Sequence, residues 1–368
     1  MSSAVFSALP FIVAAVAAAT ALGFVLTPLS IRLTRRLAAP DGRRGHASAR
    51  RASRAGGLAV VFSFVGVGIC AVAFNGLVGA LPQMRLLAQE QLWAVFGGVI
   101  AAASAGLLID RFRLAHGWRL AACVGLAVVG LVAGLGTGTT FEAGAVELGG
   151  LAVVAATVIS IGWTMAIIVS LDRADGVAGL SGGVALVAAV TLATASLTPA
   201  VNQPSVALLC AVLAGSLAGS LPWTFHPARV SLGASGVLAV GFALTALSVM
   251  GADKGTALLL VMAVPLADTM WMVLRRLSTR DARGRHGSLL HPRLRDYGLT
   301  HRGALFVIYA ISLVLAVTSL VLPAQGRIVA FAGILVLAGV TLYLLSRDVT
   351  MTRGQGGSEQ GQTSGSGR

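Results

Sequence analysis

Long apolar stretches alternate with short polar ones along almost the whole chain. The apolar stretches are near 20 residues in length, which is enough for an α-helix to cross a hydrocarbon core of about 30 Å. Helices are expected because lipid cannot satisfy exposed backbone polar groups. We predict eleven spans, at residues 4–29, 56–79, 92–108, 118–136, 148–169, 177–197, 204–221, 231–250, 256–275, 303–322 and 328–346. The pattern predicts an all-α polytopic membrane protein with a single helical domain over residues 1–346.

The basic residues fall almost entirely on one side of these predicted spans. Of the 27 Lys and Arg residues, only Arg85, Lys254 and Arg327 lie in the other set of loops. The positive-inside rule then places the N-terminus outside and the C-terminus in the cytoplasm of a multi-pass plasma-membrane protein. The predicted cytoplasmic loops are residues 30–55, 109–117, 170–176, 222–230 and 276–302. The tail, residues 347–368, is rich in Gly, Ser and Gln and is expected to be disordered.

Composition supports a membrane protein and narrows the choice of partners. Hydrophobic residues make up 56% of the chain and charged residues only 11%, against about 25% charged in soluble domains. The net charge of +14 is confined to a few short loops between apolar stretches. This placement favours membrane orientation and contact with anionic lipids, and argues against a nucleic-acid partner. Whether the chain forms a homodimer stays open.

Polar side chains that could carry chemistry gather on the predicted cytoplasmic side. All six histidines lie there, together with four aspartates near span ends: Asp41, Asp110, Asp172 and Asp175. Loops collect polar residues in any membrane protein, which is one interpretation. Several carboxylates beside Arg-rich loops also fit a phosphorylated substrate with Mg²⁺.

Two further features stand out within or beside the spans. Asp268 lies inside the predicted span 256–275, where an ionisable side chain should face the bundle interior or a cavity. A hydrogen bond between helices is the alternative for this residue. The stretch from Asp175 to Gly183 is a glycine-rich turn that opens a helix, and exposed amides there favour anions. Close helix packing through glycine explains that stretch equally well.

Motif fragments in order along the chain resemble one family. They are Pro40–His46 with Arg54–Gly57, Gly106–Arg111, Leu171–Gly183, Leu221–Arg229, Ser231–Val237, Pro265–Thr269, and His291–Leu294 with Gly298–Arg302. Together they resemble the polyprenyl-phosphate N-acetylhexosamine-1-phosphate transferases. That family includes undecaprenyl-phosphate N-acetylglucosamine-1-phosphate transferase and phospho-N-acetylmuramoyl-pentapeptide transferase. The resemblance covers residues 40–302, most of the chain.

The resemblance implies an activity and a set of site residues. Family members transfer a sugar-1-phosphate from a UDP-N-acetylhexosamine to a polyprenyl phosphate in cell-envelope polysaccharide synthesis, at a cytoplasmic Mg²⁺ site. It implies catalytic roles for Asp110 and Asp175 and a metal site at Asp172 and Asp175. The residues implied to bind substrate phosphates are Arg43, Arg44, His46, Arg229, His291 and Arg293.

The chain departs from the family pattern at the positions that carry the chemistry. Ile109 replaces the first member of an aspartate pair, and Ala178 and Ala234 each replace an aspartate. Asp172 stands where the family has Asn. Because alanine and isoleucine cannot coordinate Mg²⁺, these changes put the Mg²⁺ site in question. Two alternatives to transfer follow: an inactive family member that binds a lipid phosphate, a nucleotide sugar or a partner enzyme, or a transporter.

Overall fold

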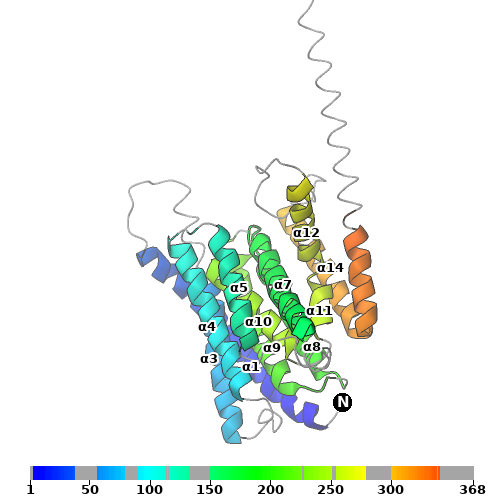
Figure 1. Cartoon of the computed structure of the whole chain (residues 1–368). Helices are drawn as coiled ribbons and strands as arrows, with labels where there is room; N and C mark the ends of the chain where they lie inside the picture. The colour runs from blue at the N-terminus through cyan, green and yellow to red at the C-terminus, as the bar shows by residue number, and fades with distance from the viewer. Residues whose placement is uncertain are drawn as a thin grey trace, which may run out of the picture.

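The described part of the chain folds as a helical bundle. A computed structural model describes residues 3–37, 56–78, 89–112, 114, 116–132, 150–199, 201–225, 228–250, 254–278, 300–337 and 339, and every regular element among them is a helix. The first helices are α1 (Ser3–Leu37), α3 (Gly56–Val78), α4 (Gln89–Phe112), α5 (His116–Val132) and α7 (Gly150–Ala174). They are followed by α8 (Leu180–Leu197), α9 (Pro204–Thr224), α10 (Gly233–Val249), α11 (Lys254–Val261), α12 (Ala263–Ser278) and α14 (His301–Val321). A last helix covers Ala324–Leu337 (Figure 1).

Apolar length supports the prediction of a polytopic membrane protein. Seven of the described helices are long and apolar enough to cross a bilayer, and the bent pair α11 and α12 makes an eighth. Three shorter apolar helices, Gly117–Val132, Gly233–Val249 and Ala324–Leu337, coincide with other predicted spans. The exact count of eleven spans and their orientation stay predictions.

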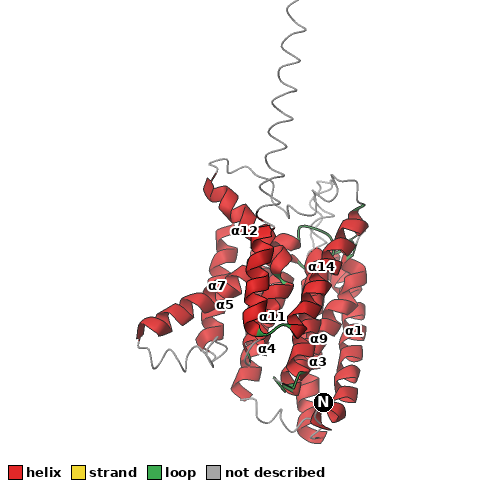
Figure 2. Ribbon diagram, turned by 90° about the vertical axis from the view of Figure 1, so that its right-hand side faces the viewer, coloured by secondary structure: helices red, strands yellow, loops and turns green. Residues whose placement is uncertain are grey.

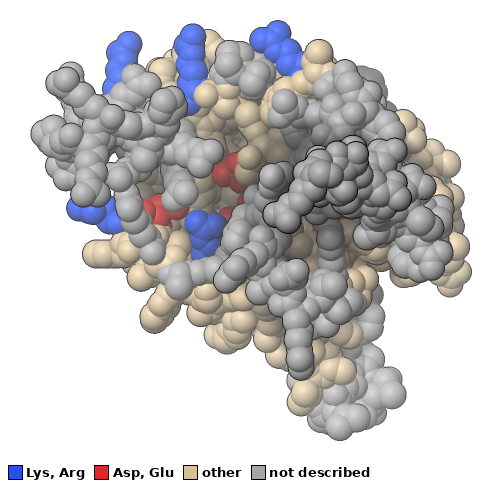
Figure 3. All heavy atoms as spheres, turned by 90° about the horizontal axis from the view of Figure 1, so that it is seen from above, with Lys and Arg blue, Asp and Glu red and all other residues tan. Residues whose placement is uncertain are grey.

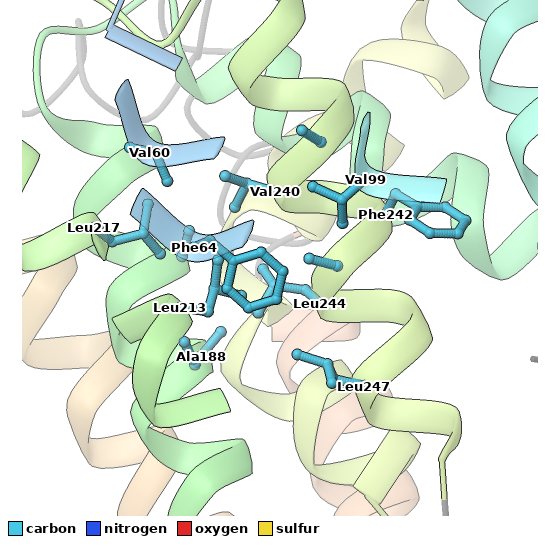
Figure 4. Close-up of a cluster of buried hydrophobic side chains, with 14 of the residues drawn as sticks. Val60, Phe64, Val99, Ala188, Leu213, Leu217, Val240, Phe242, Leu244 and Leu247 are labelled. Atoms are coloured by element: carbon cyan, nitrogen blue, oxygen red, sulfur yellow. The ribbon is translucent and has the colours of Figure 1, made fainter. Parts of the chain in front are cut away.

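Helices α9 and α10 form the centre of the bundle. Every residue of α10 except Val249 is buried, as expected for the core position of a helix that is apolar all round. It packs against α3, α4 and α7, while α9 packs against α1, α3 and α8. Figure 4 shows side chains from both helices meeting those of α3, α4 and α8. The outer helices α1 and α14 instead leave many apolar side chains exposed, as expected where lipid is the solvent.

Several helix ends differ from the predicted spans, and two differences matter for the site. Helix α4 continues to Phe112 and α7 to Ala174, so Asp110 and Asp172 lie in last helical turns and not in loops. The predicted span 256–275 is also broken: α11 and α12 meet at 69° (Figure 2). Pro265 explains the break, because proline has no N–H to donate to the carbonyl of Val261, the last residue of α11.

Candidate functional site

Two aspartates from different elements cap the N-terminus of α10. The carboxylate of Asp175 accepts hydrogen bonds from the backbone N–H groups of Leu232, at 3.2 Å, and Gly233, at 3.0 Å. Asp110 Oδ2 accepts one from the N–H of Ala234, at 2.8 Å. The first N–H groups of a helix have no partner within it and carry its positive dipole end. Both carboxylates therefore have a structural task at the start of the most buried helix.

The turn that carries Asp175 is held firmly. Its N–H donates to the carbonyl of Leu171 at 2.9 Å, and its Oδ1 accepts from the Ser181 hydroxyl at 2.8 Å. Gly179 has φ = 84°, a left-handed conformation that favours glycine, and its carbonyl accepts from the Tyr309 hydroxyl at 2.6 Å. Burial raises the pKa of Asp175 from 3.8 to about 6, against the lowering effect of these hydrogen bonds.

A third carboxylate is joined to this cluster by an arginine. In the first turn of α5, Arg119 donates from one nitrogen to both carboxylate oxygens of Asp172: Nη1 lies 2.9 Å from Oδ1 and 3.1 Å from Oδ2. Its Nη2 lies 3.9 Å from Asp110 Oδ1. The guanidinium thus lies between Asp110 of α4 and Asp172 of α7. Viewed onto this end of the bundle, acidic and basic side chains lie side by side in a hollow (Figure 3).

These carboxylates do not fit the Mg²⁺ site that the resemblance implies. Asp110 and Asp175 accept backbone N–H groups, and both oxygens of Asp172 face the Arg119 guanidinium. Ala234 lines the same small cavity as Arg119 and Asp172, so an apolar methyl stands where the family motif has a carboxylate. Within the described ranges, no group of three or more His, Cys, Asp or Glu side chains is arranged to hold a metal ion.

A mostly apolar groove opens beside the Asp175 turn. Ala174, Leu180, Val184, Val264 and Ile308 line it, together with Pro265 and the carboxyl-bearing Asp268. These residues come from α7, α8, α12 and α14. The expectation that Asp268 faces a cavity is therefore consistent with the structure. Pro265, near the bend between α11 and α12, forms part of the groove wall.

Of the residues predicted to bind substrate phosphates, the structure describes one, Arg229. Arg229 is exposed, and its guanidinium lies over the ring of Trp223, 5.4 Å from the ring centroid. Such stacking holds the side chain by a cation–π interaction. The predicted phosphate-binding residues Arg43, Arg44, His46, His291 and Arg293 lie outside the described residues. Their roles stay predictions.

Sequence reasoning missed the central position of Arg119. From the sequence, this residue is interpreted only as one of the positive charges that orient the protein in the membrane. One signal could have found it: Asp172 replaces Asn, and an additional carboxylate near a site often has a cationic partner. Only the packing of α5 against α7 shows that Arg119 supplies that partner.

Comparison with known proteins places this arrangement in a family. Residues 92–252 match the model of glycosyl transferase family 4. A putative glycosyltransferase of Streptomyces coelicolor is 34% identical over 91% of this chain and 76% of its own length. A probable undecaprenyl-phosphate N-acetylglucosaminyl 1-phosphate transferase of Bacillus subtilis is 26% identical, over 81% of each chain. A decaprenyl-phosphate N-acetylglucosaminephosphotransferase of Mycolicibacterium smegmatis is 29% identical over 72% of this chain and 71% of its own.

The fold and the acidic cluster define an all-helical membrane protein with its polar groups gathered where α4 and α7 end and α10 begins. The relatives make the assignment definite: the chain belongs to glycosyl transferase family 4. It is a membrane glycosyltransferase-family protein that resembles the polyprenyl-phosphate sugar-1-phosphate transferases of cell-envelope synthesis. The resemblance inferred from the motif fragments is confirmed.

Proposed function

We propose that this chain binds a polyprenyl phosphate at the cytoplasmic face of the plasma membrane and does not carry out Mg²⁺-dependent sugar-1-phosphate transfer. The observation that carries the proposal is the engagement of the remaining carboxylates. Asp110 and Asp175 cap α10, and Asp172 is paired with Arg119. The eleven spans, with the N-terminus outside, form part of the same proposal.

Loss of carboxylates has a clear chemical consequence for the family reaction. Transfer brings a nucleoside diphosphate sugar and a lipid phosphate together and needs charge stabilisation on the transferred phosphate. Removing one such electrostatic stabiliser commonly costs about 10²–10³ in rate. The chain carries Ile109, Ala178 and Ala234 at three of the family's aspartate positions, so the combined loss should leave almost no turnover.

Binding of the lipid phosphate has separate support. The groove between α7, α8, α12 and α14 is small and mostly apolar, so it offers contact to the first isoprene units and not room for the whole chain. Arg229 lies exposed on the loop before α10, where it can meet a phosphate. Arg43, Arg44, His46, His291 and Arg293 are proposed to complete the phosphate contacts, with a UDP-N-acetylhexosamine as a second ligand.

Retained transfer is the second candidate, and one observation favours it. Asp110, Asp172 and Asp175 all lie at the same end of the bundle, linked through Arg119 and the N-terminus of α10. In this alternative a rearranged set of the same carboxylates holds Mg²⁺ once both substrates are bound. The relatives named as transferases give this candidate its substrates, a UDP-N-acetylhexosamine and a polyprenyl phosphate.

A reaction and binding assay separates the two candidates. Purified protein in nanodiscs would receive undecaprenyl phosphate, Mg²⁺ and a panel of UDP-N-acetylhexosamines, with release of UMP as the first readout. Saturable binding of undecaprenyl phosphate to the same sample is the second. We expect binding without UMP. UMP release that Asp110→Asn abolishes would establish transfer instead, and solute flux without lipid binding would indicate a transporter.

A further inference from the structure

The cation between Asp110 and Asp172 is a side chain of the protein itself, the guanidinium of Arg119. Each residue lies in the terminal turn of a different helix: the end of α4, the start of α5 and the end of α7. The guanidinium donates from Nη1 to both oxygens of Asp172, at 2.9 and 3.1 Å, and its Nη2 lies 3.9 Å from Asp110 Oδ1. The carboxylate side chains are only 22% exposed for Asp172 and 12% for Asp110.

Such a pair of carboxylates needs a positive charge. Two like charges held near one another at a partly buried site repel, and an interposed cation offsets that repulsion. Arg suits this place better than Lys, because its two terminal nitrogens reach different carboxylates: Nη1 donates to Asp172, and Nη2 lies beside Asp110. Asp172 provides two acceptor oxygens for Nη1, where the Asn of the family motif would provide one.

The same guanidinium excludes a divalent ion from the site. A cation that bridged Asp110 and Asp172 would have to take the position of Arg119 and overcome its charge. Apart from Arg119 and Asp172, the cavity beside it is lined by apolar side chains such as Ala234 and by the Cys123 thiol, and none of these offers an oxygen ligand. An ion would therefore find two occupied carboxylates and apolar surroundings.

We infer that the Arg119 guanidinium takes the place of a divalent cation between Asp110 and Asp172, so that this end of the bundle is held together without metal. This inference rests on the proposed function and adds to it the residue that replaces the ion. Arg119 is a positioning residue in this account: it fixes the ends of α4 and α7 relative to α5 and contacts no reacting atom.

Removal of the guanidinium should convert the site into one that accepts a divalent ion. The experiment compares wild type with Arg119→Gln in nanodiscs of neutral lipid, using Mn²⁺ as the probe and electron paramagnetic resonance to count bound ions. We expect no stoichiometric Mn²⁺ on wild type. Arg119→Gln should bind about one ion per chain with an affinity at least about tenfold higher, a difference of ~1.4 kcal/mol, and Mn²⁺ should raise its unfolding temperature.

A matched control excludes a general effect of charge. Arg229→Gln removes the same positive charge at the same end of the bundle, but Arg229 lies over Trp223 and not between the two carboxylates. This variant should stay as weak in Mn²⁺ binding as wild type. Equal gains in both variants, no gain in Arg119→Gln, or stoichiometric Mn²⁺ on wild type would each overturn the inference.

Misfolding of Arg119→Gln would itself be informative. The double variant Arg119→Gln/Asp172→Asn removes one carboxylate along with the guanidinium, so it should fold and bind no Mn²⁺. Failure of the double variant to fold would show that Arg119 does more than compensate charge and would overturn the inference. The Mn²⁺ measurement needs no lipid phosphate or nucleotide sugar, so its result is independent of the binding assay for the proposed function.

Discussion

The titration of Asp175 gives a prediction whose size follows from the structure. Burial raises its pKa to about 6 in the folded protein from 3.8, so the folded state binds the proton more tightly than the unfolded state. A group with a raised folded pKa contributes stability that is complete below the unfolded pKa and is lost as the pH rises through the folded pKa. Acidification from pH 7.5 to 5 should therefore increase the stability contributed by this residue.

The two pKa values set the magnitude of the effect. At pH 7.5 Asp175 is ionised in both states and contributes almost nothing to pH dependence. At pH 5 it is mostly protonated when folded and mostly ionised when unfolded, which adds about 1 kcal/mol. The limiting gain, reached well below pH 3.8, is about 3 kcal/mol. For a chain of 368 residues, the gain at pH 5 corresponds to a rise of roughly 1–2 °C in unfolding temperature.

The assay is the unfolding temperature in detergent at pH 7.5 and pH 5, measured at one scan rate for wild type and Asp175→Asn. Other groups titrate in both proteins, so the informative quantity is the difference between their pH responses. Asn cannot ionise, and the variant should lack the stabilisation that wild type gains on acidification. Identical pH responses, or a larger gain in the variant, would refute the assignment of a raised pKa to the Asp175 cap.

Three further predictions concern the same end of the bundle. Arg119→Gln and Asp172→Asn should each lower the free energy of unfolding by about 1–2 kcal/mol. Because the pair is partly exposed, a double-mutant cycle should give a coupling energy of about 1 kcal/mol. Additive effects would argue against the pair. Gly57→Ala should lower the free energy of unfolding by about 2 kcal/mol or more, because a Cβ there would lie 2.2 Å from Gly236 Cα. Gly66→Ala in the same helix is the control: its Cβ meets open space, so the variant should be neutral or stabilising. Treatment of wild type with EDTA should leave its unfolding temperature unchanged, and a clear fall would contradict a metal-free site.

Much of the fold could be predicted because hydrophobic length is a strong signal in membrane proteins. Helices α3, α8 and α9 begin within a few residues of the predicted spans. Helix α1 is longer than predicted, since it continues through basic residues to Leu37. The bend in the predicted span 256–275 was missed, although Pro265 was present as a signal.

The site was predicted in part. The side and the proximity of Asp110, Asp172 and Asp175 followed from the order of spans and motifs, and the structure brings these residues to one end of the bundle. Their partners could not be predicted, because the hydrogen bonds to the start of α10 join residues 57 to 124 positions apart. Contacts of that separation depend on how helices pack, which a linear pattern of apolar and polar residues does not encode.

The central proposal is that the acidic residues kept by this family member hold helices in place and do not hold a metal for transfer. The most direct measurement is single-turnover release of UMP, with protein in excess over radiolabelled UDP-N-acetylglucosamine in nanodiscs that contain undecaprenyl phosphate and Mg²⁺. If these residues hold no metal for transfer, no UMP should appear above a protein-free control. A full equivalent of UMP, dependent on Mg²⁺ and lost in Asp110→Asn, would contradict it.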